Sequence, residues 1–422
     1  MASSDRPPPD APTTAGTVAG TVAGTVAGAL ANAPSRGRDP VRVAVLGSTG
    51  SIGGSTLEVI AGSAGRFGCH LLAAHSRVGP LLEQARRFRP AWVVVVDEAA
   101  AATVSRADLP EGTRLAAGAD ALDALVSAPE VDRVVSAIVG AAGLRSTWAA
   151  LEAGKTVALA NKETLVTAGP LVMGLAARRA APLLPVDSEH AAIHQALRAG
   201  GPTEVQRIIL TASGGPFREL PAAALARVTP QEALRHPTWS MGQKITIDSA
   251  TMMNKALELI EARWLFDVPP EKLAVVIHPQ SVVHSLVEFV DGSLVAQLGP
   301  PDMKMPIQYA LSYPERFPGP ARRLDFTVPI ALHFEPPDLE RFPAIGLGLE
   351  AARLGGSCGA VLNAANEVAV RLFLDGRIAF TDIVPLCARL MREHPFQPDP
   401  SLDDILRLDA WARREVATWV SG

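Results

Sequence analysis

The chain has 422 residues, of which 48% are hydrophobic and 19% carry a charge. This length predicts two to three domains with a large buried core. The 39 basic and 43 acidic side chains give a net charge of −4, so charge favours neither nucleic acid nor an anionic membrane as a partner.

The three cysteines, Cys69, Cys358 and Cys387, lie far apart in the sequence and form no C-x-x-C pair. An odd number with this spacing argues against a disulfide framework and against a structural zinc site. We therefore expect a reducing compartment, and place the protein in the cytoplasm.

Residues 1–40 differ in composition from the rest of the chain. They contain a proline run at 7–9 and a repeated Gly-Thr-Val-Ala tract over 16–28. Such a segment buries too little apolar surface to offset the entropy lost on ordering, so we predict a disordered low-complexity tail. A secretory or membrane segment is the alternative, but glycine interrupts the tract and no basic cluster precedes it. A transit peptide fits less well because Asp5 and Asp10 are acidic.

A strand, a glycine turn and a helix are predicted at the start of the folded part. Residues 41–46 form a β-branched run, residues 47–53 read Gly-Ser-Thr-Gly-Ser-Ile-Gly, and a helical pattern follows. Glycines let backbone N–H groups approach a pyrophosphate at a helix N-terminus. The spacing is G-x-x-G-x-x-G and not G-x-G-x-x-G, so a tight turn without a ligand remains an alternative.

The next predicted strand, 71–74, ends in His75, Ser76 and Arg77. A site for NAD usually has an acid at this place, whereas a site for NADP has arginine and small hydroxyls for the 2′-phosphate. Arg77 could equally be a solvated surface residue. With further strands predicted at 92–96, 134–139 and 156–159, the region 41–186 indicates a doubly wound parallel sheet of the α/β class.

Acidic side chains follow the strand predicted at 183–186. Asp187 and Glu189 are two residues apart, and their oxygens suit a hard cation such as Mg²⁺ or Mn²⁺. The segment 248–261 is predicted to be a helix with a Ser or Asp cap, on which Asn254 and Glu258 share a face and Lys255 lies beside them. These groups could serve a phosphate and a metal together, or form a solvated helix surface.

Two loops lie between these acids. Residues 211–216, Thr-Ala-Ser-Gly-Gly-Pro, follow a strand predicted at 208–210 and offer a hydroxyl and backbone donors to a phosphate. Residues 236–242, His-Pro-Thr-Trp-Ser-Met-Gly, have the composition of a loop whose Trp239 could close over a ligand. The alternative for the second loop is a surface turn with its tryptophan in the core.

The other histidines offer weaker signals. His190 and His194 are four residues apart on a predicted helix, but no H-E-x-x-H motif and no third ligand mark a zinc site. His278 and His284 flank the start of a predicted hairpin with its turn at Asp291-Gly292, and we interpret both as structural.

Seven motifs follow one another in a single order along the chain from Val41. They are Gly-Ser-Thr-Gly-Ser-Ile-Gly (47–53), Ala-Asn-Lys-Glu (160–163), Pro-Val-Asp-Ser-Glu-His (185–190), Ser-Gly-Gly-Pro-Phe-Arg (213–218), His-Pro-Thr-Trp-Ser-Met-Gly (236–242), Asp-Ser-Ala-Thr-Met-Met-Asn-Lys (248–255) and Leu-Asn-Ala-Ala-Asn-Glu (362–367). In this order they resemble the 1-deoxy-D-xylulose 5-phosphate reductoisomerase family. The resemblance implies an NADPH-dependent and divalent-metal-dependent enzyme that rearranges and reduces this sugar phosphate to 2-C-methyl-D-erythritol 4-phosphate, in non-mevalonate isoprenoid synthesis.

The resemblance also implies roles for individual residues. The metal ligands would be Asp187, Glu189 and Glu258. Lys162, Glu189 and Glu258 would be catalytic. Substrate contacts would come from Lys162, Ser188, Glu189, Ser213, His236, Ser249, Asn254, Lys255 and Glu258, with Trp239 and Met241 in a closing flap. NADPH contacts would come from Thr49, Gly50, Ser51, Ile52, Ser76, Arg77, Asn161, Glu163 and Gly242. The family's usual Gly-Lys/Ser-Asn pattern after the second strand is replaced here by His75-Ser76-Arg77, so the contacts at the adenosine end stay open.

The domain organisation follows from these motifs and from composition. We predict a Rossmann-type NADPH-binding domain at 41–186 and an α+β catalytic, metal-binding domain at 187–312 with its flap near 236–242. A connector at 313–344 lies within the proline-rich, irregular stretch 300–343, and a small helical C-terminal domain of three or four helices occupies 345–422. The resemblance implies a homodimer. A simple NADP-linked dehydrogenase, or a non-catalytic NADPH-sensing protein, are the alternatives, but neither explains the acids at 187, 189 and 258.

Overall fold

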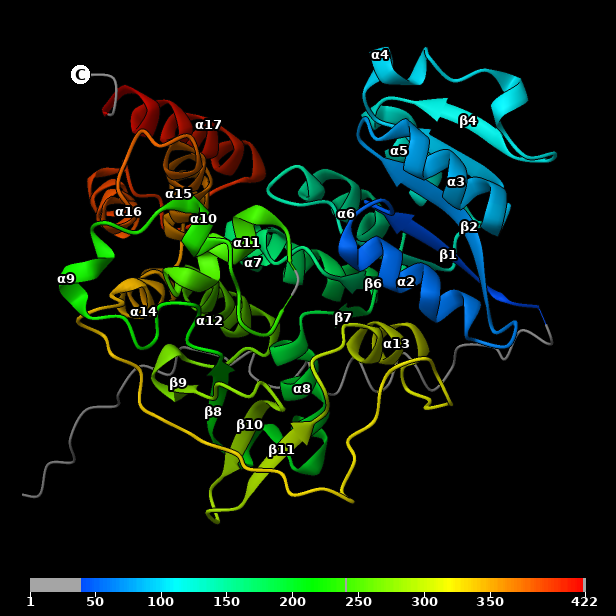
Figure 1. Ribbon diagram of the computed structural model, residues 1–422. Coiled ribbons are helices and arrows are strands. Elements are labelled where there is room, and N and C mark those ends of the chain that lie inside the picture. The colour runs from blue at the N-terminus through cyan, green and yellow to red at the C-terminus, as the bar shows by residue number, and fades with distance from the viewer. Residues whose placement is uncertain (1–38, 240, 420–422) are drawn as a thin grey trace, which may run out of the picture.

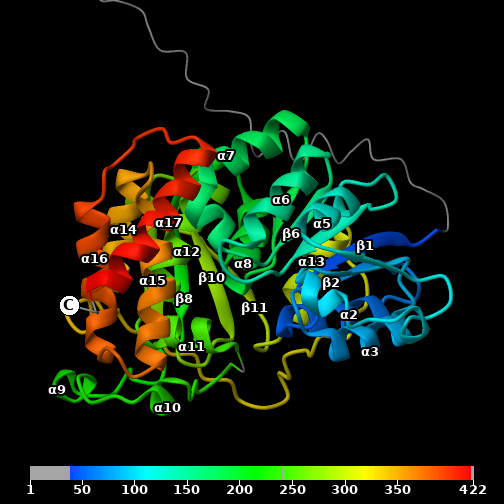
Figure 2. The ribbon, with the colours of Figure 1, turned by 90° about the horizontal axis from the view of Figure 1, so that it is seen from above.

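The computed structural model describes residues 39–239 and 241–419, so the tail predicted at 1–40 lies almost entirely outside the described residues. Three parts follow one another along the chain (Figure 1). A parallel sheet with helices comes first, a smaller mixed sheet follows, and a group of helices ends the chain. Seen from above, the first sheet and the C-terminal helices lie at opposite ends, with α7, α8 and α12 between them (Figure 2).

The first sheet has seven strands in the order β4-β3-β2-β1-β5-β6-β7, and every pair in it is parallel. Its strands are β1 (Val41–Leu46), β2 (Phe67–Ala74), β3 (Trp92–Val95), β4 (Arg114–Ala117), β5 (Arg133–Ser136), β6 (Thr156–Leu159) and β7 (Leu183–Pro185). Its helices are α2 (Ser51–Ala61), α3 (Val78–Phe88), α4 (Glu98–Ala101), α5 (Ala119–Val126), α6 (Gly143–Glu152) and α7 (Glu163–Arg179), with a 3-10 turn η1 (Arg106–Asp108). The doubly wound α/β prediction is confirmed.

Both faces of the sheet are covered at its centre, which is why strands such as β3 and β6 are nearly continuous apolar runs. Alternate residues of β1 enter two different cores. Val43 and Val45 pack with α2 and α3 on one face, while Ala44 and Leu46 pack with α5, α6 and α7 on the other. The strand order changes direction at β1, because β2 lies on one side of it and β5 on the other. Open sheets of this kind bind ligands at that point, beyond the carboxyl ends of the strands.

The second sheet has the order β11-β10-β8-β9 and mixes parallel and antiparallel pairs. Its strands are β8 (Val205–Ala212), β9 (Leu273–Ile277), β10 (Val283–Phe289) and β11 (Leu294–Leu298), and the predicted hairpin joins the last two. Around it lie α8 (Ser188–Ala196), α9 (Ala222–Leu225), α10 (Pro230–Ala233), α11 (Gln243–Ala250) and α12 (Met253–Leu265), with 3-10 turns η2 (Leu197–Ala199), η3 (Pro202–Glu204) and η4 (Pro270–Lys272).

Four helices form the C-terminal part, in agreement with the prediction of three or four. They are α14 (Ala344–Leu354), α15 (Cys358–Leu374), α16 (Ile383–Glu393) and α17 (Leu402–Trp419), with the 3-10 turn η5 (Phe380–Asp382). One continuous core joins them to β8 and α12, so these helices are not an independent globule. Among residues 39–239 and 241–419, no helix has the length and apolar character that a membrane crossing requires.

Three local predictions were wrong. The chain leaves the sheet at Val95 and at Ser136, earlier than the expected ends at 96 and 139, and Val139 is largely exposed in the loop that follows. The stretch 300–343 contains a helix, α13 (Lys304–Ser312), because its apolar face, including Ile307 and Leu311, packs into the core beside α2.

The single helix predicted over 248–261 is also wrong. The structure has two helices there, separated at Met252, whose φ of 61° is left-handed. Asp248 and Ser249 therefore lie in the last turn of α11 and do not cap α12. The prediction that Asn254 and Glu258 share one face is confirmed, since the Asn254 amide donates to the Glu258 carboxylate.

Candidate active site

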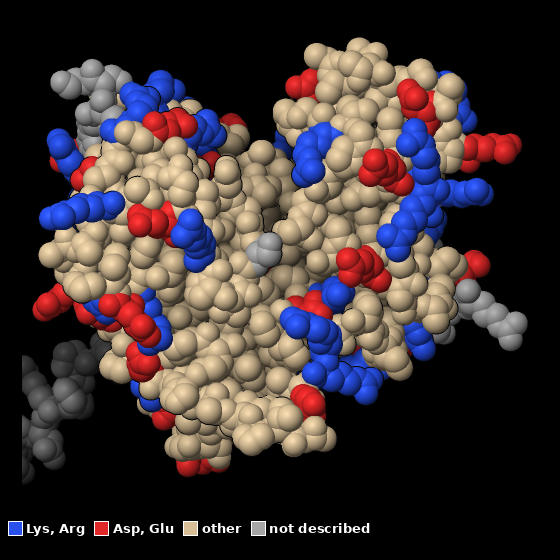
Figure 3. Space-filling model, viewed as in Figure 1, with Lys and Arg blue, Asp and Glu red and all other residues tan. Residues whose placement is uncertain are grey.

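A cavity of about 700 Å³ opens at the carboxyl ends of the first sheet's strands. Its walls come from the turn after β1, the starts of α7 and α8, the loop 236–242 and helices α11 and α12. The space-filling view has a hollow between the two lobes of the molecule, with basic and acidic side chains interspersed around it (Figure 3). The cavity therefore lies where the fold of the first domain predicts a ligand.

The turn before α2 brings backbone close to the cavity. Gly47 has a φ of +74°, and a Cβ there would lie 2.5 Å from the carbonyl oxygen of Ala137. A Cβ on Gly53 would lie 2.4 Å from the backbone of Ser48. Only glycine fits either position, and the N-terminus of the eleven-residue α2 is left facing the cavity. That end carries positive dipole and free N–H groups, which suit a pyrophosphate.

Three predicted cofactor residues do not line the cavity, namely Thr49 in this turn and Ser76 and Arg77 just after β2. The Arg77 guanidinium donates to the carbonyl oxygen of Thr49 over 2.9 Å. Arg77 is therefore held next to the glycine turn, and its side chain is exposed.

The remaining predicted residues all line the cavity. They are Gly50, Ser51, Ile52, Asn161, Lys162, Glu163, Asp187, Ser188, Glu189, Ser213, His236, Trp239, Met241, Gly242, Ser249, Asn254, Lys255 and Glu258. The tertiary structure thus gathers six motifs that are separated by up to about two hundred residues into one cavity.

Three carboxylates form the acidic end of the cavity. Oxygens of Asp187, Glu189 and Glu258 lie within 4.8 Å of one another. Asp187 follows β7 and caps α8 by accepting from the Glu189 N–H over 3.2 Å, and Glu258 projects from α12 with 1% of its surface exposed. Burial and the neighbouring Glu258 carboxylate raise the pKa of Glu189 to about 7. Acids gathered in this way need a cation.

In the structure two lysines supply that positive charge. Lys162 Nζ lies 2.8 Å from Asp187 and 3.1 Å from Glu258, and Lys255 Nζ lies 3.0 Å from Glu189 and also contacts Glu258. Burial would lower the pKa of Lys162, but Asp187 and Glu258 hold it well above its ordinary value. Two ammonium groups thus serve three acids, and a divalent cation among the same carboxylates would take over part of that neutralisation.

A second group of possible ligands shares Asp187 and adds His190 and Glu261. His190 Nδ1 lies 3.2 Å from Asp187, and Nε2 lies 3.0 Å from the carbonyl oxygen of Glu258. Both partners only accept, so both ring nitrogens carry protons. Although burial opposes it, Glu261 and Asp187 raise the pKa of His190 to about 9. In this arrangement both His190 ring nitrogens already donate to protein oxygens, whereas Asp187, Glu189 and Glu258 offer only the hard oxygen ligands that suit Mg²⁺ or Mn²⁺.

His194 points away from this group. Its Nδ1 lies 2.6 Å from the hydroxyl of Tyr309 on α13, so the pair His190 and His194 does not converge on one point. His278 and His284 are the two histidines near the predicted hairpin. His278 bonds the carbonyl of His333 and the backbone N–H groups of 282 and 283, as a structural residue does. His284 bonds the carbonyl of Gly299 but also lines the cavity, a position that its sequence context did not reveal.

The opposite end of the cavity carries hydroxyls and an imidazole. His236 Nε2 lies 3.1 Å from both Ser213 Oγ and Ser249 Oγ. Its Nδ1 accepts from the backbone N–H of Trp239 over 2.9 Å, so Nε2 is the protonated nitrogen of a neutral ring. Burial lowers the pKa of His236 below its ordinary value, in keeping with that neutral state.

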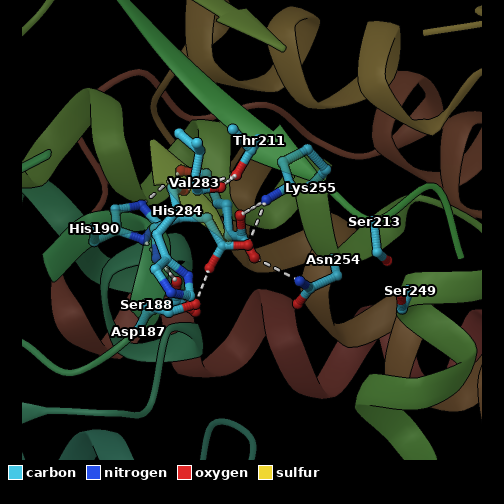
Figure 4. Close-up of polar contacts among 12 residues, drawn as sticks. Asp187, Ser188, His190, Thr211, Ser213, Ser249, Asn254, Lys255, Val283 and His284 are labelled. Atoms are coloured by element: carbon cyan, nitrogen blue, oxygen red, sulfur yellow. Dashed lines mark hydrogen bonds and ion pairs between the residues drawn. The ribbon is translucent and has the colours of Figure 1, made fainter. Parts of the chain in front are cut away.

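Figure 4 shows the two ends apart, with Ser213 and Ser249 on one side and Asp187 and Ser188 on the other. Asn254 lies between them, and its side-chain oxygen accepts from Lys162 over 2.7 Å. Lys255, which the resemblance assigns to the phosphate, points toward the acids in the same view. An extended ligand with an anion at one end and oxygens at the other matches this arrangement.

Some cavity residues were missed by the sequence reasoning. Lys244, Ser281, Asp302, Lys304 and Arg322 line the cavity as well. For Lys244 a signal existed, because it follows the loop 236–242 by two residues in the first turn of α11. The others lie in stretches without a motif, and only the folding of the chain brings them to the cavity.

Three family models match this chain. That of 1-deoxy-D-xylulose 5-phosphate reductoisomerase covers residues 43–169, that of its C-terminal domain covers 183–266, and that of the DXP reductoisomerase C-terminal domain covers 298–415. The 1-deoxy-D-xylulose 5-phosphate reductoisomerase of Heliobacterium modesticaldum is 54% identical over 375 residues, covering 88% of this chain and 96% of the relative. That of Rhodopirellula baltica is 50% identical and covers 91% and 96%.

Solved structures agree with these matches. The reductoisomerase from Zymomonas mobilis in complex with NADPH has a TM-score of 0.85 and 46% identity, over 90% of this chain and 99% of that one. A DOX-P reductoisomerase in complex with NADPH, fosmidomycin and magnesium has a TM-score of 0.84 and 44% identity, over 90% and 98%. The chain therefore belongs to the 1-deoxy-D-xylulose 5-phosphate reductoisomerase family.

Proposed function

We propose that the large cavity is the site where the chain converts 1-deoxy-D-xylulose 5-phosphate to 2-C-methyl-D-erythritol 4-phosphate with NADPH and a divalent metal. The observation that carries this proposal is the arrangement of one cavity. Three buried carboxylates lie at one end, a Ser-His-Ser group lies at the other, and the N-terminus of α2 opens on the same space. A metal-assisted reaction on a phosphorylated ketose with a dinucleotide needs all three.

The metal would be held by Asp187, Glu189 and Glu258, since hard oxygen ligands suit Mg²⁺ or Mn²⁺. When bound, it supplies a Lewis acid that polarises adjacent substrate oxygens and stabilises negative charge on them. Ser188 donates to Glu189 over 2.5 Å and thereby fixes the orientation of that carboxylate. His190 holds Asp187 in the same way from the other side.

Lys162 and Glu258 are the groups placed to act on the substrate's oxygens. The Lys162 side chain is 6% exposed, and its Nζ is positioned by Asp187, Glu258 and Asn254. A buried ammonium in this place stabilises an alkoxide without moving far, because its partners already fix its position. Together with Ser188 and Glu189 it defines the end of the cavity where bonds would be rearranged.

The phosphate of the substrate would bind at Ser213, His236, Ser249, Asn254 and Lys255. His236 orients both hydroxyls, so a phosphate there would meet a preformed group of donors. Lys255 can serve the acids or the phosphate. Its present contacts with Glu189 and Glu258 neutralise acids that a metal would otherwise neutralise, so metal binding frees it for the phosphate.

NADPH would bind along the turn after β1, with Gly50, Ser51 and Ile52 at the pyrophosphate and Thr49, Ser76 and Arg77 toward the adenosine. Asn161, Glu163 and Gly242 also line the cavity, and we place the nicotinamide beside them, where it would meet the substrate. The loop 236–242 would close over both. His236 already ties this loop to the phosphate end through the Trp239 N–H, so phosphate binding and loop closure would be linked.

We also propose that the chain forms a homodimer and that it acts in the cytoplasm. The segment 326–334 has exposed apolar side chains at every second residue, namely Phe326, Val328, Ile330, Leu332 and Phe334. Leu294 and Leu298 of the edge strand β11 are exposed too. Apolar surface of this kind is usually covered, and a second copy of the chain is the occupant we propose. Sedimentation of the wild type and of Phe326→Asp tests it, with dissociation into monomers expected for the variant.

The enzymatic proposal is tested by one assay with the sugar phosphate, NADPH and Mn²⁺, in which NADPH oxidation is followed with and without a chelator. Turnover that requires both metal and sugar phosphate supports it. Turnover independent of metal would favour a simple NADP-linked dehydrogenase, and NADPH binding without any turnover would favour a non-catalytic sensor.

A further inference from the structure

Lys244 lies between two buried carboxylates that come from different parts of the chain. Its Nζ is 3.0 Å from Glu163 Oε1 and 2.9 Å from Asp248 Oδ2. Glu163 is the first residue of α7, directly after Lys162, and Asp248 belongs to the last turn of α11 with 1% of its side chain exposed. Burial would lower the pKa of Lys244, but Asp248 and Glu163 keep it above the ordinary value, so the group stays charged.

The same line of contacts reaches the C-terminal helices. Asp248 Oδ1 accepts from the side-chain amide of Asn366 over 2.8 Å, and Asn366 is fully buried on α15. Asn366 belongs to the motif Leu-Asn-Ala-Ala-Asn-Glu at 362–367, to which the proposed function assigns no contact with substrate or cofactor. Its neighbour Asn363 is equally buried but donates to Glu367 instead.

The position of Lys244 makes these contacts relevant to the reaction. It follows the loop 236–242 by two residues and lines the cavity. Its partner Glu163 begins the helix that follows the cavity residues Asn161 and Lys162. The ion pair therefore joins the carboxyl end of the loop to the cofactor side of the cavity, and Asp248 and Asn366 fix where that ion pair lies.

We propose that Lys244 is a positioning residue for this reaction, which clamps the end of the loop 236–242 to the start of α7 and is itself held in place from the C-terminal helices by Asp248 and Asn366. The inference rests on the proposed function. It gives the Leu-Asn-Ala-Ala-Asn-Glu motif a role in setting cavity geometry from outside the cavity. Small displacements of groups that orient a substrate can lower the rate about a hundredfold.

The test uses the full chain and a set of matched variants. Lys244→Met removes the charge and leaves Glu163 and Asp248 facing each other, so kcat/KM should fall about a hundredfold. Lys244→Arg should recover most of that loss. Asn366→Leu should lower kcat/KM about tenfold. Asn363 is an equally buried asparagine on the same helix, so Asn363→Leu should lower the melting temperature as much as Asn366→Leu does but leave kcat/KM unchanged.

The decisive measurement is the double variant. If Asn366 acts only by holding Asp248 and Lys244, then Lys244→Met with Asn366→Leu should be no worse than Lys244→Met alone, within about twofold. If the two substitutions acted independently, their losses in kcat/KM would multiply in the double variant. That result would overturn the proposal. If Lys244→Met does not fold, Asn366→Leu against Asn363→Leu decides, since equal kcat/KM in these two would also overturn it.

Affinity for NADPH separates this inference from the proposed function. It is measured by nicotinamide fluorescence without metal or sugar phosphate. Lys244→Met should weaken NADPH binding severalfold because Glu163 loses its counter-charge beside an anionic cofactor, and Asn363→Leu should not. A wild type that binds NADPH but never turns over the sugar phosphate contradicts the proposed function. Unchanged NADPH affinity in Lys244→Met contradicts the clamp.

Discussion

Lys255 Nζ lies 3.0 Å from a carboxylate oxygen of Glu189. A residue that we assign to the phosphate end of the substrate is thus paired with a residue that we assign to the metal. The contact links the two ends of the cavity electrostatically, because a dication on the acids and an ammonium on the same acids compete for the same charge. Metal and phosphate binding should therefore favour each other.

That coupling predicts the behaviour of a short molecule that carries a hydroxamate and a phosphonate. It should bridge the acids and the Ser-His-Ser group, compete with the sugar phosphate, and bind far more weakly without Mn²⁺. Lys255→Ala should raise KM and weaken the phosphonate while leaving Mn²⁺ bound, since the three carboxylates remain. Inhibitor titrations with and without Mn²⁺ on both proteins measure this. Equal inhibitor affinity with and without metal, or an affinity untouched by Lys255→Ala, would show that the site is divided differently.

The two candidate acid groups can be told apart by substitutions on one helix. Glu258→Gln should weaken Mn²⁺ binding and nearly abolish turnover, because a neutral amide is a poorer ligand for a hard cation. Glu261→Gln is the matched control, since both side chains are 1% exposed on α12 but Glu261 lies 3.7 Å from the protonated His190. Mn²⁺ affinity, read by calorimetry, should survive in Glu261→Gln. If Glu261→Gln lost Mn²⁺ binding and Glu258→Gln retained it, the metal would belong to the group with His190 and Glu261.

Cofactor preference should depend on Arg77, which stands where a site for NAD has an acid. Arg77→Glu should reverse or erase a preference for NADPH over NADH, because the new carboxylate repels the 2′-phosphate. The ratio of kcat/KM for the two cofactors measures it. Arg86→Glu on the exposed side of α3 makes the same charge change at a distance and should leave the ratio as it is. An unaltered ratio in Arg77→Glu would remove Arg77 from the cofactor site.

His194 gives a prediction for stability against pH. Burial lowers the pKa of His194 to about 4 from an ordinary value of 6.5. Between these values the unfolded chain binds a proton that the folded chain does not, so stability falls as pH falls through this window. The loss is at most about 3 kcal/mol.

Urea unfolding at pH 7.5 and 4.5 checks this. His194→Gln should lose less stability between the two pH values than the wild type, since it has no imidazole to protonate, whereas His75→Gln at an exposed position should behave like the wild type. An identical pH dependence in His194→Gln and the wild type would contradict the prediction.

The sequence by itself determined the features that local patterns encode. The apolar runs 41–46 and 156–159 are read as buried parallel strands because both sheet faces are covered, and Gly47 marks a turn because only glycine fits its backbone. The shared face of Asn254 and Glu258 follows from helical spacing alone. The ordered motifs, taken together, led to the family.

Tertiary structure decided which groups meet. Helical spacing places Lys255 on one face of α12 but does not say whether acids or hydroxyls will lie opposite. The start of α8 brings Glu189 to that face. The left-handed Met252 separates α11 from α12, where the sequence shows one continuous helical pattern. The line from Glu163 through Lys244 and Asp248 to Asn366 joins residues about two hundred positions apart. Such partners lie on different elements and meet only when these elements pack together. The spacing of residues along the chain therefore carries no information about them.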